Sequence, residues 1–133
     1  MNIITEQATV QASITEVFNF LSDAKNFEIM LPMDKISDFK ADEFGCSFKA
    51  QGGIIIPLLF ENKEPFQEIK MKSGEKAPFP YTLSILLKEN DENSCLGHIE
   101  FEANINMFMK MMVEKPLSAL FEVMTKNLQK HFA

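Results

Sequence analysis

Apolar and polar residues alternate through much of the middle of the chain. Residues 44–50 carry Phe, Cys, Phe and Ala at every second position, with Gly, Ser and Lys between them. Residues 79–87 and 96–106 repeat this alternation. A period of two predicts strands with one buried face, because successive side chains of a strand point to opposite sides. Less regular apolar segments predict further strands at residues 3–11, 35–40, 54–60 and 66–72.

Two segments show a helical period instead. Ser13 and Glu16 form a capping box, and Ile14, Val17, Phe18 and Leu21 follow at helical spacing. Asp23 can cap a second short helix, which Pro32 ends because a proline disfavours helical geometry in the residue before it. Residues 107–132 predict a long C-terminal helix, and Pro116 should kink it or start a fresh helix. Its apolar stripe consists of Leu117, Leu120, Phe121, Met124 and Leu128.

This order of elements predicts an α+β fold in one domain, residues 1–133. Strands in hairpin succession give a curved antiparallel sheet of about seven strands in the order β-α-α-β6-α. Each strand has one apolar face, so the sheet needs a cover. The amphipathic C-terminal helix is the expected cover, with the sheet wrapped around it.

Composition narrows the function classes. The formal net charge is −6, and the 13 basic residues form no dense run, which disfavours nucleic acid and anionic membrane surfaces as partners. The longest apolar run, residues 54–60, is too short to span a bilayer, so no stable membrane insertion is expected. No signal peptide is indicated, and Cys46 and Cys95 are expected as reduced thiols, so we expect a cytoplasmic protein. The 13 Phe and 9 Met indicate either a filled core or an adaptable pocket.

Local motifs resemble the helix-grip superfamily. The residues at 12–23, Ala-Ser-Ile-Thr-Glu-Val-Phe-Asn-Phe-Leu-Ser-Asp, are followed by Asn26-Phe27 and Leu31-Pro32. This pattern is similar to that of START lipid-transfer domains, polyketide cyclases and birch-pollen-allergen-like proteins, and residues 111–117 are similar to the final-helix region of small bacterial members. The resemblance implies a cavity between sheet and helix for apolar or amphipathic molecules. The chain lacks the extra elements of lipid-transfer START domains and the iron ligands of ring hydroxylases.

Strand phase then predicts which side chains line that cavity. The apolar faces, taken as pointing inward, give a wall that is nearly all hydrocarbon, with methionines and a phenylalanine of the helix closing it. The predicted ligand-binding residues are Phe48, Ile56, Leu58, Tyr81, Leu83, Ile85, Phe101, Ala103, Ile105, Met111, Met112, Phe121 and Met124.

Few polar groups can add chemistry to this wall. By phase, His98, Glu100 and Glu102 face solvent. The hydroxyl of Tyr81 either orients a ligand or bonds to the backbone as a core tyrosine, and Cys46 is expected as a buried thiol. We predict no catalytic residue, no metal site and no cofactor, since the two histidines have no ligand partners at the usual spacing.

The favoured function is a non-catalytic carrier or sensor of a small hydrophobic or amphipathic ligand, lipid-like or polyketide-like. Two alternatives stay open. One is an enzyme of cyclase or dehydratase type in which Tyr81 donates a hydrogen bond, and the other is a protein-interaction or chaperone-associated module. Ile55 and Leu59 are expected on the outer face of their strand, where a homodimer contact is predicted.

Overall fold

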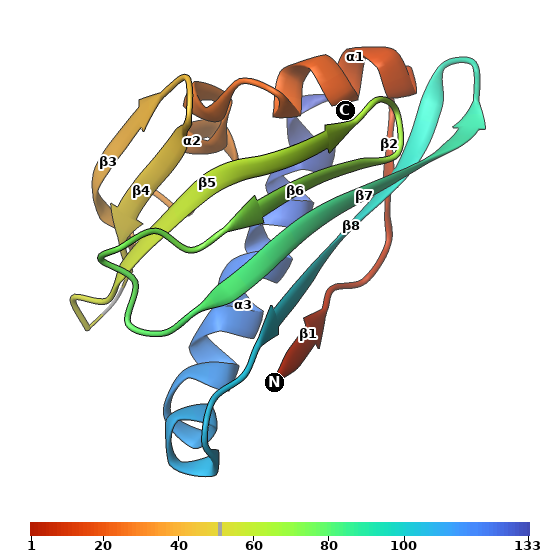
Figure 1. The fold of residues 1–133 in the computed structure, drawn as a ribbon. Coiled ribbons are helices and arrows are strands. Elements are labelled where there is room, and N and C mark those ends of the chain that lie inside the picture. The colour runs from red at the N-terminus through yellow and green to blue at the C-terminus, as the bar shows by residue number, and fades with distance from the viewer. Residues whose placement is uncertain (51) are drawn as a thin grey trace.

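The computed structural model describes residues 1–50 and 52–133. It contains one eight-stranded antiparallel sheet in the order β1-β8-β7-β6-β5-β4-β3, with β2 also paired to β8 (Figure 1). The sheet curves around the last helix, which confirms the predicted helix-grip α+β fold. The strands are β1 (Asn2–Ile4), β2 (Ala8–Val10), β3 (Ser37–Asp42), β4 (Gly45–Lys49), β5 (Ile55–Glu64), β6 (Glu68–Lys72), β7 (Tyr81–Asp91) and β8 (Ser94–Ala103).

The predicted first strand is interrupted, which is why the sheet has eight strands rather than about seven. β1 and β2 both pair with β8, and Thr5 lies in the break between them. The amide of Thr5 donates to the oxygen of Ile99 at 2.9 Å, and its hydroxyl accepts from the amide of Ile99, also at 2.9 Å. The side chain of Thr5 therefore replaces one rung of the ladder.

The N-terminal helices begin and end where their capping residues predict. α1 (Ile14–Leu21) starts at Ser13, whose hydroxyl accepts from the amide of Glu16 at 3.2 Å. Asp23 caps the 3₁₀ turn η1 (Ala24–Asn26) in the same way, at 3.0 Å from the amide of Lys25. α2 (Phe27–Met30) follows and ends before Pro32, as predicted.

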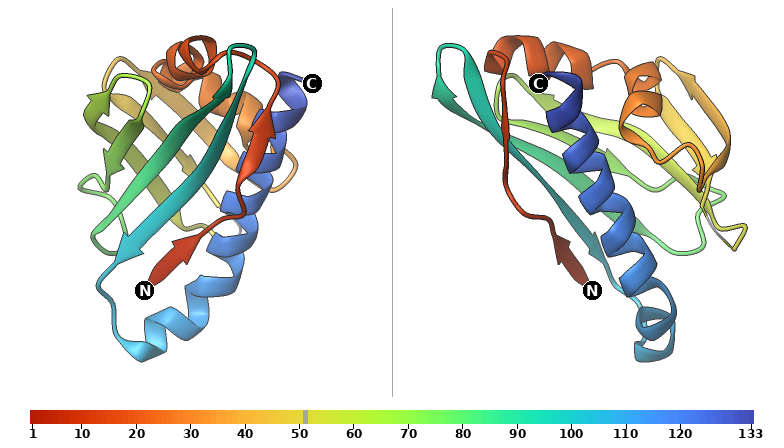
Figure 2. Two further views of the ribbon diagram at one scale, coloured as in Figure 1. Left: turned by 90° about the vertical axis from the view of Figure 1, so that its right-hand side faces the viewer. Right: turned by 180° about the vertical axis from the view of Figure 1, so that it is seen from behind.

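The helix α3 (Met107–His131) runs across the concave side of the sheet (Figure 2). Three side-chain amide or hydroxyl bonds attach its second half to the rest of the chain. Thr125 donates to the Thr5 hydroxyl at 3.3 Å, Asn127 to the oxygen of Met30 at 2.9 Å, and Gln129 to the oxygen of Thr9 at 3.0 Å. The C-terminal half of α3 is thus fixed against β2 and α2.

The N-terminal part of α3 is bent away from the C-terminal half and lies beyond the sheet (Figure 2). Pro116 lies inside a continuous helix, and the first turns lean away from the axis of the remainder (Figure 2). A proline has no N–H for the helical bond and its ring crowds the preceding turn, which explains a bend at this point. The first turns therefore extend past the end of the sheet. No helix within residues 1–50 and 52–133 combines the length and the apolar character needed to cross a membrane.

Candidate functional site

The strands turn the predicted apolar side chains towards the inner face of the sheet. The predicted residues of β4, β5, β7 and β8 are buried, and so are Phe121 and Met124 of α3. Their space is filled, however, because aromatic rings from both layers meet. The ring of Phe101 lies 5.1 Å from that of Tyr81 and 4.8 Å from that of Phe121. The buried set is Phe48, Ile56, Leu58, Tyr81, Leu83, Ile85, Phe101, Ala103, Phe121 and Met124.

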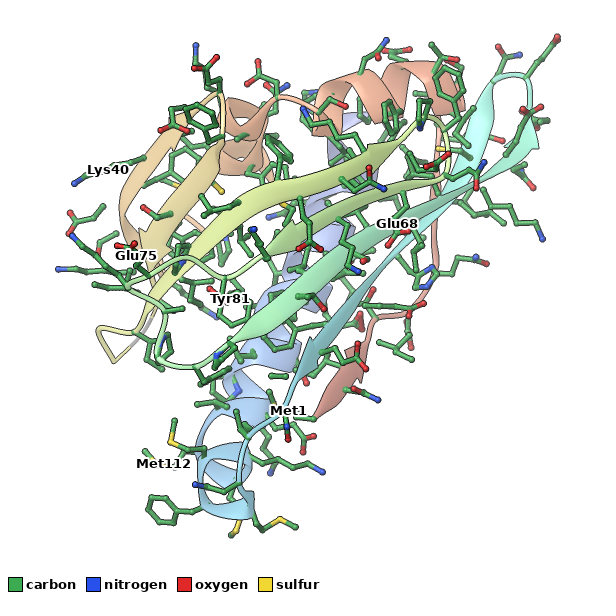
Figure 3. All side chains as sticks on the ribbon, in the orientation of Figure 1. Met1, Lys40, Glu68, Glu75, Tyr81 and Met112 are labelled. Atoms are coloured by element: carbon green, nitrogen blue, oxygen red, sulfur yellow. The ribbon has the colours of Figure 1, made fainter. Side chains whose placement is uncertain are left out.

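The expectation that Met111 and Met112 close the cavity needs correction. Their side chains are 77% and 59% exposed, and Met112 projects from the start of α3 into solvent (Figure 3). Val113 instead faces the core, and Ile105 is half-buried in the connection that precedes α3. The reason is geometric, since these turns of α3 lie beyond the sheet and only one of their sides meets the core.

The apolar pocket lies at the open edge of the grip, away from the predicted lining. It has a volume of about 130 Å³ and sits between α3, the connection after α2 and the ends of the β4–β5 hairpin. None of the thirteen predicted residues belongs to it, and their contact with a ligand stays a prediction. The lining consists of Pro32, Lys35, Ile36, Ala50, Ile54, Val113, Pro116, Leu117, Ala119, Leu120 and Val123.

Sequence periodicity could not locate this pocket, because its walls come from three separate segments. The available signal was the apolar character of Val113, Leu117 and Leu120 on one side of α3, which predicted burial but not an unfilled space. Small side chains, Ala50 and Ala119, leave the gap at its rim.

The chemistry of the pocket is that of a hydrocarbon site with one charge. Lys35 is the only titratable residue in the described lining, and its side chain is exposed at the edge. An apolar group can enter between the aliphatic walls while the ammonium of Lys35 meets an anionic or polar head. Apart from the exposed Lys35, the described lining contains no side chain that could serve as an acid, base or nucleophile.

The hydroxyl of Tyr81 is occupied by the protein itself. It donates to the backbone oxygen of Pro57 at 2.6 Å in a buried position. In the β4–β5 ladder Ala50 donates to Ile54, so the alternation leaves Pro57 and Ser47 as a pair without cross-strand bonds. The oxygen of Pro57 therefore points away from β4, towards the β6 side of β5. The pairing with β6 begins only at Leu59, so β6 offers no amide here, and the hydroxyl of Tyr81 donates instead. A proline is tolerated at this position of β5 for the same reason, since no strand partner requires an N–H from residue 57.

The outer face carries the polar groups of β8, as predicted. His98 contacts Glu100 through Nε2 and Oε2 at 2.8 Å, and Glu102 is exposed on the same side. Among the described residues, no three His, Cys, Asp or Glu side chains gather in a way that would hold a metal ion.

The outer face of β5 is partly covered by another segment of the chain. Ile55 and Leu59 are half-buried, and the loop after β6 passes over this strand. The loop approaches so closely that a β-carbon on Gly74 would lie 3.2 Å from Cβ of Pro57. Part of this apolar surface thus has an intramolecular partner, and the homodimer contact through Ile55 and Leu59 stays a prediction.

Both cysteines are free and buried, as expected. Burial, with a smaller contribution from the charge of Asp42, raises the pKa of the Cys46 thiol from 9.0 to about 12. Burial also raises the pKa of Cys95 and, with the nearby Cys46, that of Tyr81. These groups are neutral in the folded protein at pH values at which the unfolded chain ionises.

We therefore expect alkaline destabilisation through Cys46. The stabilisation is complete below the unfolded pKa of 9.0 and is lost as the pH rises towards the folded pKa of about 12. Above pH 9 the free energy of unfolding should fall by about 1.4 kcal/mol per pH unit for this thiol. Urea unfolding of wild type and Cys46→Ala between pH 7 and 10.5 tests this. The curves should run parallel below pH 8 and diverge above pH 9, whereas parallel curves throughout would contradict the expectation.

Solved structures show the same fold at low sequence identity. XoxI from Bacillus cereus is 19% identical with a TM-score of 0.76, and the match covers 98% of this chain and 94% of that one. A START superfamily protein from Mycobacterium smegmatis is 13% identical with a TM-score of 0.74, covering 98% and 96%.

A third match is the di-domain ARO/CYC BexL from the BE-7585A biosynthetic pathway. It is 10% identical with a TM-score of 0.74, covering 98% of this chain and 45% of that one. No protein-family model and no curated protein matches the chain. The likeness establishes a START-like and polyketide-cyclase-like fold, in agreement with the resemblance of the local motifs.

Proposed function

We propose that the protein binds a small amphipathic molecule and carries or senses it without chemical change. The observation that carries the proposal is the apolar pocket of about 130 Å³ between α3 and the β4–β5 hairpin. An apolar cavity of about 150 Å³ is large enough for benzene. The pocket therefore suits one ring or the end of an acyl chain, with the rest of the ligand outside.

The placement of charge supports an anionic or polar head on the ligand. Lys35 stands at the edge of an otherwise aliphatic lining, so a carboxylate outside the pocket can lie near its ammonium. Because this lysine is exposed, its contribution to affinity is small, about fivefold at most. The aliphatic contacts supply most of the binding energy.

Two observations favour a carrier or sensor over a cyclase or dehydratase. Apart from the exposed Lys35, the described lining offers no acid or base. Tyr81, the candidate donor, is engaged with Pro57 inside the filled part of the core.

The unpaired, buried cysteines suit a reducing compartment, which supports a cytoplasmic location.

An NMR titration with octanoate tests the proposal. Octanoate offers a carboxylate and a short acyl chain, and it should shift the signals of Ile54, Val113 and Leu117. Ala119→Phe places a large side chain at the rim and should weaken binding at least tenfold, since it takes the space of the acyl group. The control is Lys126→Phe, which puts the same side chain at an exposed position two turns further along α3.

Two results would contradict the proposal. One is the absence of saturable shifts at these residues with the wild type. The other is equal affinity of wild type and Ala119→Phe, which would mean that octanoate binds elsewhere.

A further inference from the structure

The first two turns of α3 have large apolar side chains on a side that none of the described residues covers. The side chains of Met107, Phe108, Met111 and Met112 are 68%, 71%, 77% and 59% exposed. Their spacing puts them on one side of the helix. The opposite side, which includes Val113, is buried against the core. We call these four residues the α3 apolar end.

A helix that is apolar on both sides normally has a partner on both sides. The start of α3 has the core on one of them and solvent on the other (Figure 3). We propose that the α3 apolar end docks reversibly on the surface of a zwitterionic lipid bilayer, inserting these four side chains among the lipids.

The distribution of charge supports a bilayer surface. Residues 104–116 contain two lysines and one glutamate, a net charge of +1 in a chain of net charge −6. Lys110 lies 3.8 Å from the carboxylate of Glu114, which leaves Lys115 as the cation for lipid phosphates beside the inserted apolar groups. The β7–β8 hairpin, which carries the exposed Glu89, Asp91 and Glu92, lies at the opposite end of the molecule (Figure 2). Docking through α3 therefore keeps these acidic groups away from the membrane.

The size of the surface disfavours a second copy of the chain as the occupant. Four side chains at these exposures offer on the order of 500 Å², whereas a stable protein interface needs roughly 800 Å² from each partner. Insertion into lipid has no such threshold, because the transfer of each apolar side chain from water to lipid lowers the free energy independently of the others.

The position of the pocket supports the same occupant, and this step rests on the proposed function. Val113 directly follows Met112 in α3 and Pro116 comes about one turn after it, and both line the pocket. A docked molecule would hold the pocket close to the membrane surface, where amphipathic ligands concentrate. Exchange of ligand then avoids a passage through water.

Sedimentation with phosphatidylcholine vesicles tests the docking. The wild type should cosediment, and Phe108→Ser should lower the partition coefficient about tenfold by removing one inserted ring. Phe44→Ser is the matched control, because Phe44 is similarly exposed, at 66%, but lies in the β3–β4 turn. It should stay within twofold of the wild type.

Oxidation gives a second test that needs no substitution. Mild peroxide converts exposed methionines into polar sulfoxides, so Met107, Met111 and Met112 should react while the buried Met71 and Met124 are protected. Vesicle binding should then fall as far as in Phe108→Ser and return after enzymatic reduction of the sulfoxides.

Three results would overturn the docking. They are no vesicle binding by the wild type, equal loss in Phe108→Ser and Phe44→Ser, and a dimer in light scattering that Phe108→Ser dissociates. Octanoate titration separates this inference from the proposed function. Phe108→Ser should bind octanoate like the wild type. Vesicle binding without octanoate binding by the wild type would contradict only the ligand proposal, and octanoate binding without vesicle binding would contradict only the docking.

Discussion

Replacing Phe121 by alanine is expected to lower the free energy of unfolding by about 3–5 kcal/mol. The side chain is fully buried, and its ring lies 4.8 Å from that of Phe101 across the interface between α3 and the sheet. Both sides of that interface are regular backbone, with α3 held by Thr125 and Asn127 to the chain around it. The site can collapse only in part, so the variant keeps a cavity.

That cavity should accept a ligand at a place in the core that Phe121 fills in the wild type. An apolar cavity of about 150 Å³ stays dry and binds benzene. We therefore expect benzene to raise the unfolding midpoint of Phe121→Ala by more than that of the wild type, in which only the edge pocket can take it up. Phe44→Ala is the control for loss of a ring, because Phe44 is exposed and its replacement should change stability by less than about 0.5 kcal/mol.

The experiment decides how this chain uses the helix-grip fold. If benzene restores the unfolding midpoint of Phe121→Ala, then Phe121 fills a space in which a ligand could be held. The edge pocket would then be the part of the interior that core side chains leave unfilled. A cost below about 1 kcal/mol, or the same benzene effect in wild type, would mean that the interior packs loosely, against the observed ring contacts.

The sequence predicts the fold and the buried faces because these depend on local patterns. Ser13 caps α1 through a bond only three residues long, and Phe48 and Phe101 are buried because side chains alternate along a strand. The alternation fails at Phe44, which shares the phase of Phe48 but is exposed because it lies in the turn before β4.

The candidate site could not be predicted in the same way, since it depends on contacts between distant segments. Periodicity shows that Tyr81 and Phe121 face inward but not that Phe101 contacts both rings. It marks Met111 and Met112 as apolar but does not reveal that β8 ends at Ala103, before the helix begins. The volume that a fold encloses depends on how its layers pack together, so no single segment of the sequence predicts it.

Replacing Gly45 by alanine is expected to destabilise the protein by at least about 3 kcal/mol. The φ angle of Gly45 is +151°, and a β-carbon there would lie only 2.1 Å from the backbone oxygen of Leu58. A flexible side chain could move aside, but this oxygen belongs to the central part of β5. Relief of the clash requires β4 to move away from β5 or the backbone of Gly45 to change conformation.

Gly53→Ala separates the two sources of this cost. Gly53 also has a positive φ, +81°, but a β-carbon there would meet nothing within 4 Å. Its replacement should cost only the conformational strain, about 1 kcal/mol, so the difference between the two variants in urea unfolding measures the clash with β5 together with the greater strain at φ +151°. If both variants lose the same amount, β4 is free to shift. The positions of Phe48 in the core and of Ala50 at the pocket would then not be fixed by the close approach of these two strands.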